Sequence, residues 1–298
     1  MSHQSTKRRL FIQKLSSAAA LSFLTTKRSV SKDAIELAPP ICMTCGTQFP
    51  PSRQRPELCP ICEDERQYVG LNGQQWTTLS TVQTKHFNII KQWDAGVYSI
   101  HTSPKFGIGQ RAFLIQTDEG NLLWDCVSLI DPKTIHEIQR LGGVDAIAIS
   151  HPHYYSSMIE WSRSFDNAPV YLHENDKQWV MRTDGPVHFW SGKSRNLFGQ
   201  LSLIHTPGHF EGFQVLHKPG VLFAGDQPQV CMDKRWVSFM YSYPNYVPLA
   251  PHQIKDIVGA LSPLDFGKLY GAFPHQNIRQ NAKEIISRSA KRYIQAIS

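Results

Sequence analysis

The sequence predicts an α/β protein in which a small cysteine-rich module precedes one larger domain. From about residue 68 onward, short apolar segments alternate with amphipathic segments of helical period, which is the pattern of an α/β fold. Before that point, four cysteines form two C-x-x-C pairs. A chain of 298 residues can bury a substantial core, and one large domain with an appendage accounts for this length.

The positive charge of the chain is concentrated at its N-terminus. The net charge is +7, and residues 1–32 hold seven basic and no acidic side chains. The other 266 residues hold 24 basic and 24 acidic side chains. A surface that follows a phosphate backbone needs an excess of basic residues in the folded part. We therefore expect a small-molecule substrate and no nucleic-acid partner.

Residues 1–32 resemble a twin-arginine export leader. Arg8 and Arg9 are followed by Phe11 and Ile12, and then by a mildly apolar run over residues 15–24. This run is shorter than the roughly 20 residues that a membrane-spanning helix needs, so we expect no stable membrane span. The resemblance implies export, for example to the periplasm. If the leader is not functional, the protein is cytoplasmic.

The four cysteines of residues 38–67 predict a metal site. Cys42 and Cys45 form one pair, Cys59 and Cys62 form the other, and 13 residues separate the pairs. Two such pairs supply the four thiolates of a tetrahedral metal site. In an exported protein, the alternative is that the same cysteines form disulfide bonds. The pairs are similar to those of rubredoxins and zinc ribbons. We expect a structural zinc ion, with iron as the alternative metal, in a site closed to substrate.

Residues 68–298 contain the predicted strands and helices of the larger domain. Two apolar strands are joined by a turn at 118–120, and a helix follows whose apolar residues share one face and whose end is marked by Gly142. The last helix carries an apolar stripe from Ile286 to Ile297. The predicted strands are 111–117, 121–126, 144–150, 169–173, 201–205 and 215–224, the last interrupted by a turn at 218–220, and the predicted helices are 132–141, 251–261 and 282–297.

Side chains that bind metals follow several of these strands directly. His151 and His153 come after one apolar strand, His209 after a second and Asp226 after a third, while Asp125 lies at the end of a fourth. Side chains at strand ends are held by the sheet and can meet at a common rim. Three histidines with one open coordination position are typical of catalytic zinc. The pattern thus predicts a metal centre at this rim.

These motifs together resemble the metallo-β-lactamase superfamily in its glyoxalase-II-like form. The matching segments are Leu122–Asp125, Ser150–His153, Thr206–His209 and Ala224–Asp226, within residues 90–275. The resemblance implies a four-layer α/β/β/α sandwich with the metal site at one edge. It also implies that Asp125 is a structural carboxylate beneath the site and not a ligand.

The chain departs from the superfamily pattern at the second metal site. That pattern places an aspartate and a histidine where this sequence has Tyr155 and Ser156. His275 matches a further ligand motif only loosely. We therefore expect one metal ion held by His151, His153 and His209, with Asp226 as a fourth ligand or as a base beside the bound water, and with His275 as an additional candidate ligand.

The predicted activity is metal-dependent hydrolysis of a small ester, thioester, lactone or amide. Asp226 is expected to orient the water or accept its proton, and Tyr155 either donates a hydrogen bond to the oxyanion or fills the space of the missing metal. Arg235, Trp236 and Tyr241, from an aromatic segment after Asp226, are candidate substrate-binding residues.

Two other function classes remain open from the sequence. Histidines with a carboxylate also bind iron, so the protein could be a mononuclear iron oxygenase or a redox protein that uses iron in the cysteine module. Alternatively, the loss of the second metal site could accompany loss of activity, which would leave a catalytically silent metal-binding module.

Overall fold

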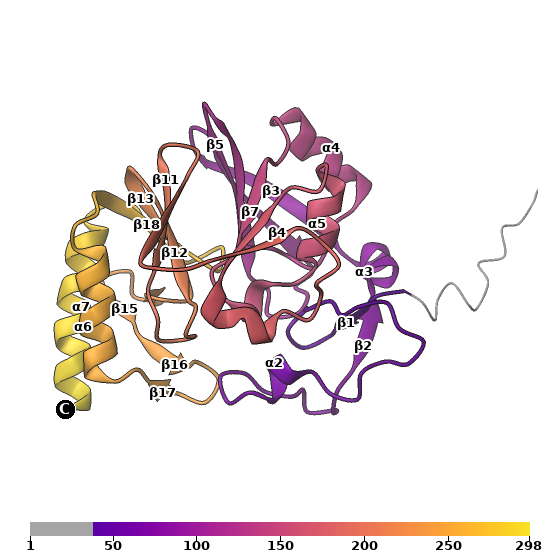
Figure 1. Cartoon of the computed structure of the whole chain (residues 1–298). Coiled ribbons are helices and arrows are strands. Elements are labelled where there is room, and N and C mark those ends of the chain that lie inside the picture. Colours follow the sequence, from indigo (N-terminus) through magenta and orange to yellow (C-terminus); the bar gives the residue numbers. More distant parts are fainter. Residues whose placement is uncertain (1–37) are drawn as a thin grey trace, which may run out of the picture.

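The computed structural model describes residues 38–298, in which two β-sheets face each other and helices cover their outer faces (Figure 1). The predicted export leader at 1–32 lies outside the described residues. None of the helices within residues 38–298 is both long and apolar enough to cross a membrane. The four-layer α/β/β/α arrangement is the one expected from the sequence.

The first sheet has seven strands that neighbour one another in chain order. Strands β3 to β6 pair antiparallel, and β6 to β9 pair parallel. Helices α4 (Pro132–Arg140) and α5 (Met158–Ser164) connect parallel strands. The strands are β3 (Phe87–Asp94), β4 (Val97–Ser103), β5 (Arg111–Thr117), β6 (Gly120–Trp124), β7 (Ala146–Ala148), β8 (Val170–His173) and β9 (Val187–Trp190).

The second sheet has six strands in the order β10-β11-β12-β13-β18-β19. Its only parallel pair is β13 with β18, which α6 (Pro251–Leu261) connects, and α7 (Ala282–Ile297) packs beside α6. The strands are β10 (Ser194–Leu197), β11 (Leu201–His205), β12 (Gln214–Lys218), β13 (Gly220–Gly225), β18 (Phe266–Gly271) and β19 (Asn277–Ile278).

Three apolar layers hold the four structural layers together. Side chains alternate between the two faces of a strand. In β5, Leu114 therefore packs toward α4 and α5, while Phe113 packs between the sheets. In β13, Leu222 packs toward α6 and α7, while Phe223 packs between the sheets. The rings of Phe113 and Phe223 meet edge to face with centroids 5.0 Å apart, which joins the two sheets directly.

Most predicted elements are found, and the differences have local causes. The strands at 111–117 and 201–205 and both C-terminal helices have the predicted bounds. The strand predicted at 121–126 ends at Trp124 because Asp125 has a positive φ of 59°. No strands were predicted over 87–103. β3 lies at a sheet edge, where half of its side chains are exposed and none is buried, and this weakens its apolar pattern.

The cysteine module extends beyond the predicted boundary at residue 67. Its strand β1 (Pro40–Cys42) pairs with β2 (Trp76–Thr78), so the two-stranded sheet closes only at residue 78. Helix α2 (Pro60–Glu63) carries the last cysteine, and α3 (Leu79–Lys85) leads into the larger domain. The remaining short elements are η1 (Pro152–Tyr154), η2 (Glu174–Trp179), β14 (Gln229–Val230), β15 (Val237–Ser238), β16 (Met240–Ser242) and β17 (Val247–Pro248).

The module is fixed to the larger domain by polar contacts at the first cysteine pair. The Ser128 hydroxyl donates to the carbonyl of Gly46 at 2.7 Å, and the amide of Gln48 donates to the carbonyl of Ser156 at 3.0 Å. Gly46 has φ +85°, and a Cβ atom there would lie 2.3 Å from the Ser128 Oγ atom. Only glycine allows this close approach.

This contact predicts that Gly46→Ala destabilises the protein more than Gly73→Ala does. Gly73 has a similar φ of +75° but open space around its Cβ position. Gly73→Ala should therefore lower the free energy of unfolding by only roughly 1 kcal/mol, which is the strain of placing alanine in the left-handed region. Gly46→Ala should lower the free energy of unfolding by about 1–3 kcal/mol more, because its Cβ atom would overlap with Ser128. Urea unfolding of both variants measures the difference, and equal losses of stability would contradict the docking contact.

Candidate metal centre

Three strand ends deliver four buried metal-binding side chains to one edge of the molecule. His151 and His153 follow β7 of the first sheet, while His209 and Asp226 follow β11 and β13 of the second sheet. One ligand atom from each of the four lies within 4.8 Å of the others. The sheets thus bring together the three histidines and the carboxylate that the sequence placed after separate strands.

The spacing of these atoms fits a single tetrahedral ion. The His209 Nε2 and His153 Nδ1 atoms are 3.3 Å apart, and the His151 Nε2 and Asp226 Oδ2 atoms are 3.5 Å apart. Four ligands at zinc–nitrogen or zinc–oxygen distances have neighbouring donor atoms separated by roughly 3.4 Å. The three imidazoles can therefore bind one ion, with Asp226 either as its fourth ligand or beside a water in the fourth position.

Hydrogen bonds and burial leave the imidazoles ready to bind a cation. His209 Nδ1 lies 2.7 Å from the carbonyl oxygen of Tyr241, which can only accept, so Nδ1 carries the proton and Nε2 keeps its lone pair. Burial lowers the pKa of His209 to about 3 and also lowers the pKa values of His151 and His153. All three rings are therefore neutral at physiological pH.

His151 is oriented by Ser150 and by Asp125, which follows the neighbouring strand β6. The Asp125 carboxylate accepts a hydrogen bond from the amide of Ser150 at 2.7 Å, and the Ser150 hydroxyl lies 2.9 Å from His151 Nδ1. Burial raises the pKa of Asp125 to about 7. The His151 Nε2 atom is buried and has no hydrogen-bond partner within residues 38–298, as expected of a nitrogen that binds a metal ion.

Asp226 is an ionised carboxylate in a nearly closed setting. Burial raises the pKa of Asp226, but its polar contacts with His151 and Tyr154 outweigh this effect and lower the pKa. Gln229 donates to Asp226 Oδ1 at 3.2 Å, and the Tyr243 hydroxyl donates to the Asp226 carbonyl at 2.7 Å. The carboxylate is thus held in place with one oxygen toward the histidines.

The four cysteines form a second buried group with metal-binding geometry. The sulfur atoms of Cys42 and Cys62 are 3.6 Å apart, and those of Cys45 and Cys59 are 3.7 Å apart. Neighbouring sulfurs around one zinc ion lie roughly 3.8 Å apart, whereas a disulfide bond measures about 2.05 Å. The cysteines are free, which fits the metal site and not the disulfide alternative.

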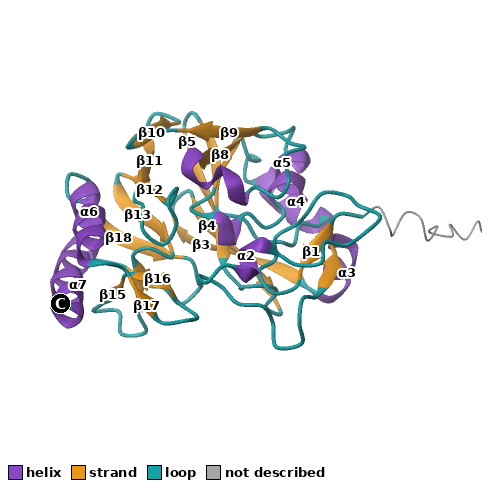
Figure 2. Ribbon diagram, turned by 60° about the horizontal axis from the view of Figure 1, so that its bottom comes forward, coloured by secondary structure: helices purple, strands orange, loops and turns teal. Residues whose placement is uncertain are grey.

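A cavity of about 260 Å³ opens onto the histidine group, and the cysteine module forms part of its wall. The module and the loops around β16 lie next to each other on this face (Figure 2). The lining residues from the module are Thr44, Arg66, Gln67 and Tyr68, and those from the metal group are His153, His209 and Asp226. The module was expected to be structural or to dock against the larger domain, and its place in the cavity wall was not predicted.

Several predicted site residues are not brought to the metal group. His275, in the turn after β18, is exposed and stacks on Phe273. Arg235 is exposed and pairs with Asp233 at 2.8 Å. Trp236 lies under Arg292 of α7, with 4.1 Å from the guanidinium carbon to the ring centroid. None of these three predicted residues lines the cavity.

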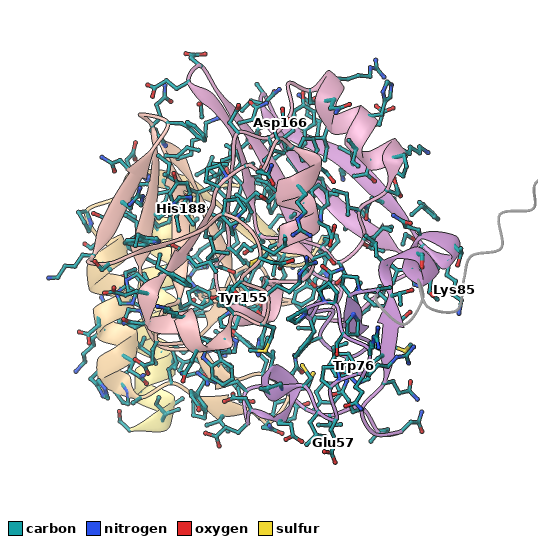
Figure 3. All side chains as sticks on the ribbon, turned by 45° about the vertical axis from the view of Figure 1, so that its right-hand side comes forward. Glu57, Trp76, Lys85, Tyr155, Asp166 and His188 are labelled. Carbon is teal, nitrogen blue, oxygen red and sulfur yellow. The ribbon has the colours of Figure 1, made fainter. Side chains whose placement is uncertain are left out.

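Two tyrosines also differ from expectation. The Tyr155 side chain, labelled in Figure 3, belongs to the apolar core against α4 and α5. It does not line the cavity. Its neighbour Tyr154 instead packs on His151 with ring centroids 4.4 Å apart. Burial and the Asp226 charge raise the pKa of Tyr154 well above its usual value. Tyr241 contributes its carbonyl oxygen to His209, while its hydroxyl donates to Glu65 at 2.8 Å.

The residues that support the site were not predicted from the sequence. Arg66 lies in an ordinary charged stretch after the last cysteine. The Gln227 carboxamide oxygen accepts from the amide of His209 at 2.7 Å, and Gln229 holds Asp226. Both glutamines follow Asp226 within three residues, so proximity to a ligand was the one clue available.

The chain is similar to an uncharacterized bacterial protein over most of its length. No protein-family model matches it. It is 47% identical over 266 residues to the uncharacterized protein YmaE of Bacillus subtilis (strain 168). The alignment covers 87% of this chain and 96% of YmaE.

The fold is that of the metallo-β-lactamases. VMB-1 matches with a TM-score of 0.54 at 12% identity, over 71% of this chain and 98% of that one. The DIM-1 metallo-β-lactamase matches with a TM-score of 0.53 at 13% identity, over 71% and 98%. A metallo-β-lactamase from Pontibacter korlensis matches with a TM-score of 0.53 at 14% identity, over 70% and 99%. At such identities the likeness concerns the fold alone.

The two buried groups predict separable metal binding. Protein produced with ample zinc should hold one ion per group. His153→Ala should remove the ion of the histidine group and leave that of the cysteine module, because no cysteine is disturbed. Cys59→Ser should do the reverse. Elemental analysis of the purified variants measures the stoichiometry.

His275→Ala is the matched control, because His275 is exposed and outside the group of four. It should retain both ions. Loss of one ion from His275→Ala, or full retention by His153→Ala, would contradict this ligand assignment.

Proposed function

We propose that this chain, which belongs to the family of the uncharacterized Bacillus subtilis protein YmaE, is a metal-dependent hydrolase of a small ester, thioester, lactone or amide. The relative is uncharacterized, so the proposal depends on the site itself. The observation that carries it is the buried group of three neutral imidazoles and one ionised carboxylate at the base of an open cavity.

The donor set suits hydrolytic chemistry. Neutral imidazoles, such as those of His151, His153 and His209, are typical ligands of catalytic zinc. The cavity gives small molecules access to two of them. A divalent ion bound there would supply a Lewis acid for a carbonyl oxygen and would lower the pKa of water to about 7. Residues of this chain would carry out the proton transfers.

Asp226 is placed to handle the proton of the attacking water. Its carboxylate is ionised and lines the cavity, so it can accept that proton while the water oxygen bonds to the acyl carbon. The bond from the acyl carbon to the leaving oxygen, sulfur or nitrogen then breaks, and the proton passes to the leaving group. Gln229 holds the carboxylate in position through Oδ1.

The cavity favours a small substrate with an apolar part. Its volume of about 260 Å³ lies just below the usual range of ligand pockets. Ile108, Tyr243, Pro244 and Phe273 line it beside the polar groups. Apolar lining of this kind would bind the acyl chain and exclude bulk water from the reacting carbon.

Asp226→Asn should lower kcat/KM by about 100-fold to 10,000-fold, the usual loss of a general acid or base. The measurement is steady-state hydrolysis of a panel with one chromogenic ester, one thioester, one lactone and one chromogenic amide, with zinc content determined on the same samples. If Asp226 acts as a base, the variant keeps its zinc. If it is a ligand, zinc affinity falls together with activity.

Asp176→Asn is the matched control, because Asp176 is as buried as Asp226 but is not one of the four clustered residues. Its retained oxygen can still accept from the amide of Gly212, so activity should remain within a few-fold of wild type. Zinc-loaded wild-type protein that hydrolyses none of the four substrate classes, or full activity of Asp226→Asn, would contradict the proposed function.

A further inference from the structure

We infer that the cavity wall contributed by the cysteine module is a carboxylate-binding subsite, so that the substrate carries a carboxylate besides its hydrolysable acyl group. This inference rests on the proposed function and narrows its substrate class. It depends on Arg66 of the module and on Lys105 of the β4–β5 connection, both of which line the cavity beside His153 and His209.

Arg66 is a buried guanidinium held in one orientation. Only 10% of its side chain is exposed. Its Nε and Nη2 atoms donate to the two oxygens of Asp64 at 2.6 and 2.8 Å. Its guanidinium carbon lies 3.9 Å from the ring centroid of Phe210, and Nη1 donates to the carbonyl of His209 at 3.4 Å. A buried charge fixed on three sides next to a metal ligand is costly without a function.

The hydrogen-bond inventory of Arg66 is incomplete. A guanidinium has five N–H donors. Two are taken by Asp64 and one by the long contact to His209, which leaves one on each terminal nitrogen without a partner among the described residues. Donors on the two terminal nitrogens of a guanidinium can bind the two oxygens of one carboxylate. Each terminal nitrogen of Arg66 thus still has a donor for an anionic oxygen group.

The charges that line the cavity favour an anion. Arg66 and Lys105 are its two cations, and Asp226 is its one carboxylate. Asp226 belongs to the metal group, while Lys105 forms no ion pair with the acidic residues of the described chain. Asp64 already offsets the formal charge of Arg66, so the remaining charge suits a singly charged carboxylate better than a dianionic phosphate.

The arrangement gives a molecule with two functional ends a defined orientation. Its carboxylate would contact Arg66 and Lys105, its acyl carbon would face His153, His209 and Asp226, and its apolar middle would contact Ile108 and Phe273. Such positioning raises the rate by holding the reacting carbon in place.

The test is the kcat/KM ratio for two matched esters, mono-4-nitrophenyl glutarate and 4-nitrophenyl pentanoate, which differ in a terminal carboxylate against a methyl group. Zinc-loaded wild type should prefer the glutarate ester by about tenfold or more, the effect of one good charged hydrogen bond. Arg66→Lys and Lys105→Gln should each remove most of this preference, mainly through KM. Lys133→Gln, an exposed lysine on α4, should leave it unchanged. Zinc content and thermal unfolding verify that each variant is folded.

Calorimetry of zinc-loaded protein with glutarate and with inorganic phosphate separates failure of the inference from failure of the function. Glutarate binding that weakens in Arg66→Lys and Lys105→Gln supports the subsite even if neither ester is cleaved. Equal turnover of both esters would overturn the subsite while leaving the hydrolase intact. Glutarate binding that is absent or unaffected by the substitutions, or tighter binding of phosphate at these residues, would also overturn it.

Discussion

The close approach of Ser150 on the first sheet to Gly225 on the second is the contact on which the metal group depends. Gly225 has φ +55°, and a Cβ atom there would lie 2.7 Å from the Ser150 hydroxyl oxygen. The amide of Gln214 donates to the carbonyl of Ser150 at 3.0 Å, which ties the sheets together at the same level. Because His151 and Asp226 directly follow these two residues, any separation of the sheets would pull the donor atoms apart.

The cysteine module turns this edge of the sandwich into a cavity. In isolation, the module is a small unit with few apolar residues and depends on its cysteine cluster for a core. Docked through Gly46 and Gln48, it covers the histidine group and places Arg66 beside His209. The structural metal that we propose for the module would therefore influence the histidine site indirectly, because it orders the segment from which Arg66 extends.

The parts of the site that follow from sequence are those tied to strand ends. His151, His153, His209 and Asp226 could be predicted because each follows an apolar strand and belongs to a spaced motif. Tyr154 could not, since the turn of η1 decides which of two adjacent tyrosines approaches the histidines. Arg66, Gln227 and the outward placement of His275 depend on how distant loops pack, and loop packing leaves no periodic signal.

The most direct test of the central claim is a crystal structure of zinc-loaded protein with anomalous data at the zinc absorption edge. The account predicts one anomalous peak within bonding distance of the imidazoles of His151, His153 and His209, and a second peak at the four cysteines. A pair of peaks at the histidine group, or histidine rings that point away from a common centre in the presence of ample zinc, would contradict it.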